Sequence, residues 1–423
     1  MKKLLTGVAT AVAVAGVWGA GPARADVLDE WNNRAVTMSV TVAKRPPGLA
    51  FVETAIVDLA MYDAVVATAG GPHAPYGGPL DAAPGASPDA AAAQAAHDVL
   101  AWLYPGAAAE LNEALAASLA GVPDGPAKEV GVAVGAAAAQ AMIADRTGDG
   151  RDAPATYAPE PAPGVWQPTP PQFLPAQAPG LPRVKPFVLD SASRFRPGPP
   201  PLLSSRTYAR GWDEVRRRGT RDAAERTPAE TEAALFWSEH PTAQYNRLFA
   251  RVAARRAEGS VERALVYAAL NAVAADALIA TFDAKYHYGF WRPVHAIPGA
   301  DLDGNPRTAP KPSWEPLLTT PNHPEFPSAH SALTQALVVV LAALDVPGPA
   351  DYEVDSAVTR TTRRFLRAAD IERDVREARI TGGLHYRFSM DAGRRLGDRV
   401  ARYVLTHAFG PAVAEHPRSR VDR

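Results

Sequence analysis

Two cations flank a run of aromatic rings in the segment KYHYGFWRPVHAI, where Lys285 and Arg292 stand seven residues apart. If the segment is helical, seven residues make nearly two turns, so both side chains point the same way about 10 Å apart. Two cations on one face, set among apolar rings, either repel each other or share an anion. The spacing therefore indicates an anion site.

A second segment, PEFPSAHSALTQALVVVL, places a serine directly ahead of a long apolar helix. Ser328 stands at the expected N-cap, so the amides of Ala329 and His330 would point out of a helix N-terminus. Such a terminus attracts an oxyanion through its unpaired N–H groups and its dipole.

A third segment, ARITGGLHYRFSMDAG, has Arg379 six residues before His385. On one continuous helix this spacing would turn the two side chains onto different faces. The run Thr381-Gly382-Gly383 can bend the chain, because glycine adopts conformations closed to other residues. We therefore expect both side chains in one pocket.

Together the three segments indicate a site for a tetrahedral oxyanion. Lys285, Arg292 and Arg379 supply positive charge, and the two guanidinium forks can bond oxygens bidentately. No carboxylate occurs among the residues assigned to this cluster, so we expect it to exclude a metal cation.

Neutral donors and two histidines complete the predicted cluster. Ser328 and the amide of Ala329 add hydrogen-bond donors. His330 and His385 remain as an acid–base group and as an atom able to bond a central phosphorus or vanadium.

The three segments, in this order, resemble the signature of the superfamily that joins vanadium-dependent haloperoxidases to type 2 phosphatidic acid phosphatases. The resemblance covers roughly residues 281–397, and FWRPVHAI and PEFPSAHS are similar to the soluble bacterial haloperoxidase branch. It implies an all-α fold, vanadate as cofactor, His330 as the acid–base group, and His385 as the axial vanadate ligand or a phosphohistidine nucleophile. The oxyanion ligands that it implies are Lys285, Arg292, Ser328, Ala329 and Arg379.

The chain departs from the family pattern at two positions. Ala329 replaces the usual glycine between the serine and the first histidine, which keeps the amide but adds a methyl group beside the anion. Phosphatase members commonly have an aspartate four residues after the second histidine, where this chain has Ser389. Asp391, two residues further on, is a candidate substitute.

The haloperoxidase interpretation, which we favour, implies hydrogen peroxide and halide as substrates, with a small organic acceptor left open. Lys285 would polarise the bound peroxide and His330 would manage protons. His323 falls where bromide-using relatives are similar in carrying a second histidine, so we expect bromide or iodide. A soluble acid phosphatase with a phosphohistidine intermediate is the alternative, and a non-catalytic oxyanion-binding protein is a third.

Hydrophobic periodicity predicts two four-helix-bundle-like halves and no sheet. We expect an N-terminal helical region over 26–150, a Pro-rich connection over 151–205, and a helical catalytic domain over 206–423. The connection is too rich in proline for helix or central strand. We expect it to lie over the surface, anchored by Trp166 and Phe173, with a disordered linker as the alternative.

The composition and the N-terminal residues limit the expected cellular location of the protein and the classes of its partners. The net charge of −1 argues against a nucleic-acid partner, and the absence of cysteine removes disulfides and thiol chemistry. Residues 1–25 have the order of a signal peptide cleaved after Ala25, which predicts a secreted or periplasmic protein. No later stretch reaches the length of a spanning helix by this inspection, so we expect no integral membrane association. A homodimer is left open.

Overall fold

The computed structural model describes residues 26–69, 74–78, 80–81, 83–255, 259–344 and 351–409. The expected signal peptide, residues 1–25, lies outside the described residues.

The N-terminal region is helical, as expected. Side-chain caps begin two of its helices: Asp26 accepts from the backbone N–H of Leu28, and Ser87 accepts from that of Ala90. The elements are α1 (Val27–Val36), the π-helix η1 (Thr37–Val42), α2 (Pro47–Ala69), α3 (Pro88–Leu103), the 3₁₀ turn η2 (Pro105–Ala107), α4 (Ala108–Ala120) and α5 (Pro126–Arg146).

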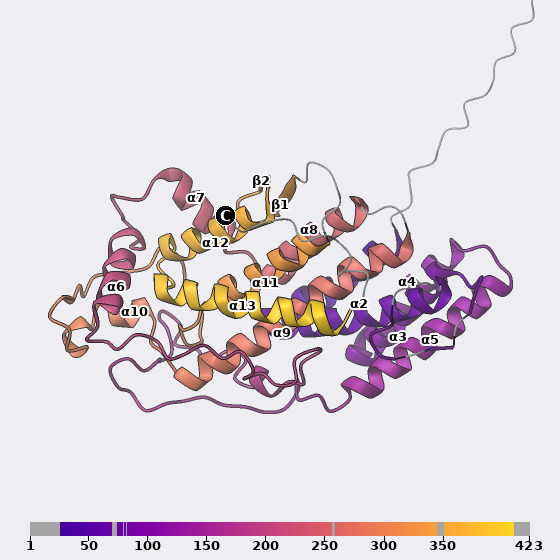
Figure 1. Cartoon of the computed structure of the whole chain (residues 1–423), viewed down its shortest axis with the longest axis horizontal. Coiled ribbons are helices and arrows are strands. Elements are labelled where there is room, and N and C mark those ends of the chain that lie inside the picture. The colour runs from indigo at the N-terminus through magenta and orange to yellow at the C-terminus, as the bar shows by residue number, and fades with distance from the viewer. Residues whose placement is uncertain are drawn as a thin grey trace, which may run out of the picture.

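The rest of the chain adds a second set of helices, which confirms the all-α prediction (Figure 1). The helices are α6 (Arg206–Arg218), α7 (Pro228–Phe236), α8 (Pro241–Arg255), α9 (Ser260–Tyr288), α10 (Pro293–Ala296), α11 (Ala329–Ala343), α12 (Ala368–Thr381) and α13 (Arg387–His407), with 3₁₀ turns η3 (Leu181–Arg183) and η4 (Ala300–Leu302).

The prediction that no strand occurs is wrong at one place. Strands β1 (Tyr352–Ser356) and β2 (Thr361–Phe365) form an antiparallel hairpin with Val354 opposite Arg363. Burial alternates along β1 over five residues only, and β2 is rich in exposed threonine and arginine. Such a short and polar pair gives little period-two signal in a sequence.

Helix α9 is the central element of the fold. It contacts α2 on one side and α11 and α13 on another, and one continuous hydrophobic core joins these helices (Figure 1). Most of α9 is buried, which is expected of a helix that is apolar on all faces. The expected boundaries at 150 and 205 stay predictions, because the two regions share this core.

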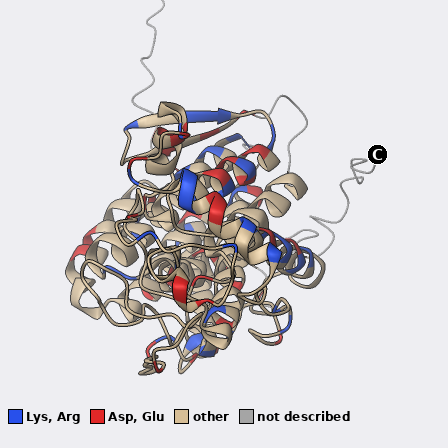
Figure 2. Cartoon of the chain, turned by 90° about the vertical axis from the view of Figure 1, so that its left-hand side faces the viewer, with Lys and Arg blue, Asp and Glu red and all other residues tan. Residues whose placement is uncertain are grey.

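By length and composition, α5 and α9 would each be able to cross a membrane, so the expectation that no such stretch exists is wrong. The apolar window of α9 is entirely buried inside the protein, as in a core helix. On the side of the molecule that Figure 2 faces, basic and acidic residues are mixed.

The Pro-rich connection is extended and packs against α9. The carboxylate of Asp276 on α9 accepts hydrogen bonds from the backbone N–H groups of Phe187, Val188 and Leu189 at 2.7 to 2.9 Å. The expected anchor Trp166 is fully buried. The expected anchor Phe173 is wrong: it is 62% exposed, in a turn where its φ is 50°.

Candidate active site

Lys285 and Arg292 lie together, but not on one helix. Helix α9 ends at Tyr288, and Gly289 follows in the left-handed conformation with φ of 57°. A side chain there would place its Cβ 2.3 Å from the hydroxyl of Tyr157, so glycine fits both the backbone and the space. Arg292 is the N-cap of α10. The prediction of a continuous helix is therefore wrong, and a turn brings the two cations together.

Both cations hold the segment that precedes α11. The Lys285 Nζ donates to the carbonyl oxygens of Pro324 at 2.7 Å and Glu325 at 2.9 Å. The Arg292 Nε donates to the carbonyl oxygen of His323 at 2.9 Å. This segment is thus fixed against the end of α9.

The N-terminus of α11 lies beside these cations, as expected. Ser328 is the N-cap, and its hydroxyl accepts from the backbone N–H of Ser331 at 3.5 Å. Its own N–H donates to the carbonyl of Ser389 at 3.1 Å, which ties α11 to α13. Ala329 and His330 occupy the first turn, so their amides point out of the helix end. Ser328 and Ala329 are buried, whereas His330 is partly exposed.

The bend predicted between Arg379 and His385 is confirmed. Helix α12 ends at Thr381, and Gly383 has φ of 79°, where a Cβ would lie 2.5 Å from the carbonyl oxygen of Gly219. Before the bend, in the last turn of α12, the Arg379 NH1 donates to the carbonyl of Trp237 at 3.1 Å, while its buried Nε has no partner among the described residues.

His385 contacts a charged group with each of its ring nitrogens. Its Nδ1 lies 2.8 Å from the Oε1 of Glu325, and its Nε2 lies 3.2 Å from the NH1 of Arg292. A carboxylate accepts hydrogen bonds, so the proton of the neutral imidazole resides on Nδ1. The Nε2 lone pair then points toward the cations. The structure thus brings together the predicted cations and His385 at one end of α9.

Glu325 is the functional residue that sequence reasoning missed. It is fully buried, and its Oε1 also accepts from the backbone N–H of Tyr386 at 3.1 Å. The expectation of a cluster without carboxylates is therefore wrong. The only sequence signal was its position in PEFPSAHS, three residues before Ser328.

Asp391 does not orient His385. Its carboxylate pairs with Arg376 and is 41% exposed, away from His385. The suggestion that Asp391 replaces the missing phosphatase aspartate is wrong, because Glu325 already occupies the Nδ1 of His385.

His323 lies next to Arg292. Its Nδ1 is 3.0 Å from the Arg292 NH2, and its ring packs against that of Phe282 with centroids 5.0 Å apart. Burial lowers the pKa of His323 well below its ordinary value, with Lys285 and Arg292 adding to the effect. His323 is therefore neutral and accepts from Arg292.

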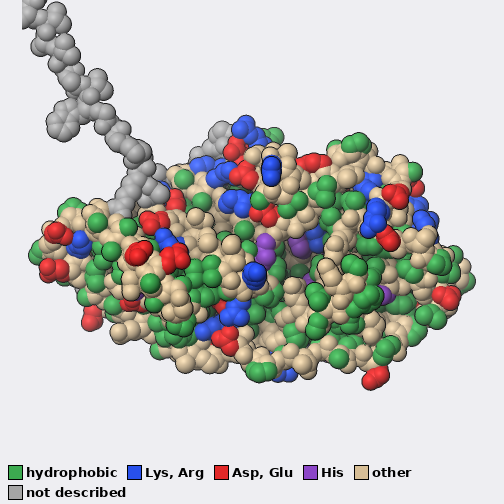
Figure 3. All heavy atoms as spheres, turned by 180° about the vertical axis from the view of Figure 1, so that it is seen from behind, with side chains coloured by type: hydrophobic (Ala, Val, Ile, Leu, Met, Phe, Trp, Pro, Cys, Tyr) green, Lys and Arg blue, Asp and Glu red, His purple; other side chains and the backbone are tan. Residues whose placement is uncertain are grey.

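The other histidines of this region have structural contacts. His240 bonds the carbonyl of Arg45 at 3.1 Å, and the exposed His287 stacks edge-on against Tyr288. His295 is partly buried on α10. Seen from behind, the protein shows histidine side chains in a hollow near its middle (Figure 3).

The site holds more positive than negative charge. Lys285, Arg292 and Arg379 are each at most 3% exposed, and Glu325 is the buried carboxylate whose charge acts on Lys285 and Arg292. Burial lowers the pKa of Arg292 to about 10 and that of Arg379 to about 9, and it lowers the pKa of Lys285 well below its ordinary value. Unpaired buried charge is costly, so the cluster favours a bound anion.

Burial also keeps the two catalytic candidates neutral. It lowers the pKa of His330 and that of His385 well below the ordinary value, and nearby arginines add to both shifts. Burial raises the pKa of Glu325 to about 7, against the opposing effect of Arg292. The arrangement is thus a cationic pocket with two neutral imidazoles.

Residues 265–411 match the family model described as the second helical-bundle domain of vanadium chloroperoxidase (VCPO). This range holds every predicted site residue. A solved bacterial vanadium-dependent iodoperoxidase has a TM-score of 0.76 at 24% identity, covering 90% of this chain and 96% of that chain. The chain therefore shares the fold of this peroxidase, and residues 265–411 resemble the second helical-bundle domain of that family. The prediction made from the three segments is confirmed at this level.

A bacterial vanadium-dependent chloroperoxidase in its holo form also has the haloperoxidase fold, with a TM-score of 0.65 at 18% identity, covering 89% of this chain and 96% of that chain. Its apo form gives a TM-score of 0.64. The chain matches none of the curated proteins.

The cofactor implied by the haloperoxidase fold fits these residues. The surplus positive charge and the unpartnered Nε of Arg379 suit a compact oxyanion such as vanadate. The Nε2 of His385 offers it a nitrogen ligand. By contrast, the described residues contain no group of three or more His, Asp or Glu side chains suited to a metal cation.

Proposed function

We propose that the protein is a vanadium-dependent haloperoxidase that oxidises halide with hydrogen peroxide, with vanadate held on His385. The observation that carries the proposal is the orientation of His385. Glu325 fixes its Nδ1 proton, and its Nε2 faces a buried cluster with excess positive charge. The match of residues 265–411 to the family model and a fold shared with solved vanadium peroxidases support the same activity.

Vanadate, when bound, supplies an electrophilic centre that activates hydrogen peroxide toward halide. Arg292 and Arg379 offset the negative charge of the oxyanion through their guanidinium groups. Lys285, held by two carbonyl oxygens, directs its remaining N–H toward the pocket and polarises the oxygen to be transferred. His330 is neutral and partly exposed, so it takes a proton from the peroxide and exchanges it with solvent.

Bromide or iodide is the halide that we propose. His323 places a neutral imidazole beside Arg292, where chloride-using relatives resemble one another in carrying an aromatic side chain. The polar ring lowers the apolar character of this side of the pocket. The solved relative with the TM-score of 0.76 is an iodoperoxidase.

Acid phosphatase activity is a second candidate, and one observation favours it. A phosphohistidine mechanism needs a carboxylate that orients the attacking imidazole, and Glu325 provides one in place of the aspartate missing at Ser389. The Nε2 of His385 would attack phosphorus and His330 would protonate the leaving alkoxide. Phosphate and vanadate share shape and charge, so the same pocket accepts both.

We further propose that the protein is exported, because residues 1–25 have the charge, apolar core and small-residue motif of a cleaved leader. Detection of the mature protein in a culture supernatant or periplasmic fraction, with its N-terminal residue determined, tests this proposal. Mature protein beginning at Asp26 is expected.

The test of function uses purified protein stripped of vanadate and then assayed with and without it. Peroxide-dependent bromination or iodination that requires vanadate, and that phosphate suppresses, is the expected result. Hydrolysis of phosphate esters with no halogenation in the presence of vanadate would contradict the proposal in favour of the phosphatase. The His385→Ala variant should lose either activity.

A further inference from the structure

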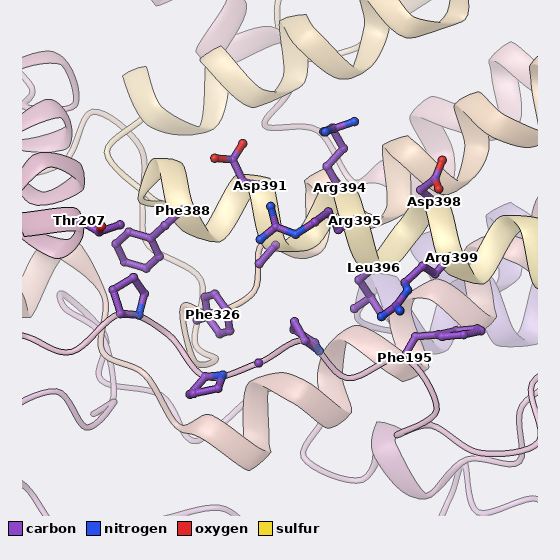
Figure 4. Close-up of a pocket in the computed structure, with 15 residues that line it drawn as sticks. Phe195, Thr207, Phe326, Phe388, Asp391, Arg394, Arg395, Leu396, Asp398 and Arg399 are labelled. Carbon is purple, nitrogen blue, oxygen red and sulfur yellow. The ribbon is translucent and has the colours of Figure 1, made fainter. Parts of the chain in front are cut away.

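A groove lies between α13 and the Pro-rich connection, and none of the predicted oxyanion ligands lines it. Its volume is about 890 Å³, far larger than a tetrahedral oxyanion needs. Its floor is apolar, with the rings of Phe326 and Phe388 and the side chain of Leu396 (Figure 4). Pro197 and Pro199 of the connection form the opposite wall.

Two arginines of α13 reach into this groove. Arg395 and Arg399 both line it, one helical turn apart, and Figure 4 shows the Arg399 side chain directed toward Phe195 of the connection. The Arg399 guanidinium lies 5.7 Å from the centroid of the Phe195 ring, at one end of the groove. Like charges four residues apart on a helix repel each other, so this pair favours an anion between them.

The carboxylates of the same stretch do not neutralise these arginines. Asp391 forms an ion pair with Arg376, and Asp398 forms one with Arg402 at 2.9 Å. Both carboxylates line the groove, but each is already paired with an arginine that does not line it. Within the part of the chain that the structure describes, neither Arg395 nor Arg399 has a carboxylate partner.

We propose that this groove is a second binding site, for an amphipathic carboxylate that has an aromatic or alkyl body. The guanidinium groups of Arg395 and Arg399 bind the carboxylate, and Phe326, Phe388 and the prolines bind the body. The volume matches that of sites for small organic molecules, and the combination of an apolar floor with a few convergent polar groups is typical of them. The proposal does not depend on the haloperoxidase activity, because the groove and the cation cluster use different side chains.

Isothermal titration calorimetry with 2-naphthoate as the probe tests the site, on the full mature chain without vanadate, peroxide or halide. Saturable binding of one molecule per chain is expected, and it should persist in excess phosphate. The uncharged analogue 2-naphthamide should bind about tenfold more weakly, because it lacks the carboxylate.

Variants locate the binding. Arg395→Gln and Arg399→Gln should each weaken 2-naphthoate binding by about tenfold. Arg373→Gln is the control, since Arg373 is an exposed arginine of α12 that pairs with Asp370 and does not line the groove, and it should change binding less than about twofold. All three arginines are exposed, so the variants should keep their unfolding temperature. The proposal is overturned by no saturable binding, by displacement with phosphate, or by equal losses in Arg373→Gln and Arg395→Gln.

Discussion

The Oε1 of Glu325 and the Nδ1 of His385 are 2.8 Å apart, and both side chains are buried. The carboxylate comes from the segment before α11, and the imidazole comes from the turn between α12 and α13. Because Glu325 takes the Nδ1 proton, the Nε2 of His385 is left with a lone pair that faces Arg292. One hydrogen bond therefore sets which nitrogen of His385 meets the anion.

The first prediction concerns this pair. Glu325→Ala should lower vanadate affinity and halide oxidation by about 10 to 100-fold, because the imidazole loses its orienting partner. Glu325→Gln should lose less, since its amide oxygen can still accept from Nδ1. Equilibrium dialysis of vanadate measures affinity without relying on turnover. Glu53→Gln, at a buried glutamate paired with Arg45 and Tyr104, is the control and should leave both quantities unchanged.

A second prediction follows from the excess of buried positive charge. Phosphate and vanadate should raise the unfolding temperature, because an anion that binds only the folded state stabilises it by about 2.7 kcal/mol at a hundred times its Kd. Arg379→Gln should weaken this effect, since it removes one of the three cations. Differential scanning calorimetry at constant ionic strength measures it. Chloride salts without sulfate are the control. An equal rise in unfolding temperature with these salts would show that the stabilisation is not due to an oxyanion in this site.

A third prediction concerns the choice of halide. His323→Phe should lower the rate of bromide or iodide oxidation relative to that of chloride, because it removes the polar ring beside Arg292. The ratio of kcat/KM values for the halides is the measurement. His287→Phe, at an exposed histidine, is the control. An unchanged ratio in His323→Phe would leave His323 without a role in selectivity.

The sequence predicted the cations and histidines of the site because each stands beside a local signal: a serine cap, a glycine bend or a run of rings. The bend at Gly383 and the N-cap at Ser328 are such signals, and the structure has both. Residues whose role depends on burial carried no such signal. Glu325 reads as an ordinary polar residue until the fold places it against His385.

The same limit applies to the fold. The spacing of Lys285 and Arg292 was interpreted on the condition that the segment is helical. Nothing local distinguishes Gly289 from other glycines, and the nearness of Tyr157 shows only in three dimensions. Trp166 and Phe173 looked alike as anchors, yet only Trp166 meets a buried surface. Local sequence signals predict caps and bends, whereas contacts between residues far apart in the chain are known only from the structure.

A fourth prediction tests how the Pro-rich connection is held. Asp276→Ala should destabilise the protein by about 2 to 4 kcal/mol, because three backbone N–H groups lose their acceptor. The connection should also become sensitive to limited proteolysis within residues 151–205, which mass spectrometry of the fragments would locate. Asp283→Ala breaks a partly buried ion pair between α9 and Arg196 of the connection, and it should have a smaller effect because no backbone N–H loses its acceptor. Cleavage confined to other regions would contradict this account.

The last prediction concerns pH and a buried polar cluster remote from the cations. Asp58 accepts hydrogen bonds from Asn32 and Asn271, and burial raises its pKa from 3.8 to about 8. Between these two values the folded protein retains a proton that the unfolded chain releases, so stability falls as pH rises through this window. Asp58→Asn mimics the protonated form and removes this dependence. The unfolding free energy of the Asp58→Asn variant minus that of the wild type should therefore rise by at least about 1 kcal/mol between about pH 5 and about pH 8.

Urea denaturation at several pH values measures this difference. Asp124→Asn is the control, because Asp124 is exposed, pairs with Lys128 and has a pKa below its ordinary value, so it does not titrate in this window. Since α1, α2, α8 and α9 each supply one residue of the Asp58 cluster, a stabilised variant should unfold with the whole shared core in a single transition. A difference in free energy that is flat from about pH 5 to about pH 8 would show that Asp58 is ionised in the folded protein, with its two amide donors outweighing the cost of burial.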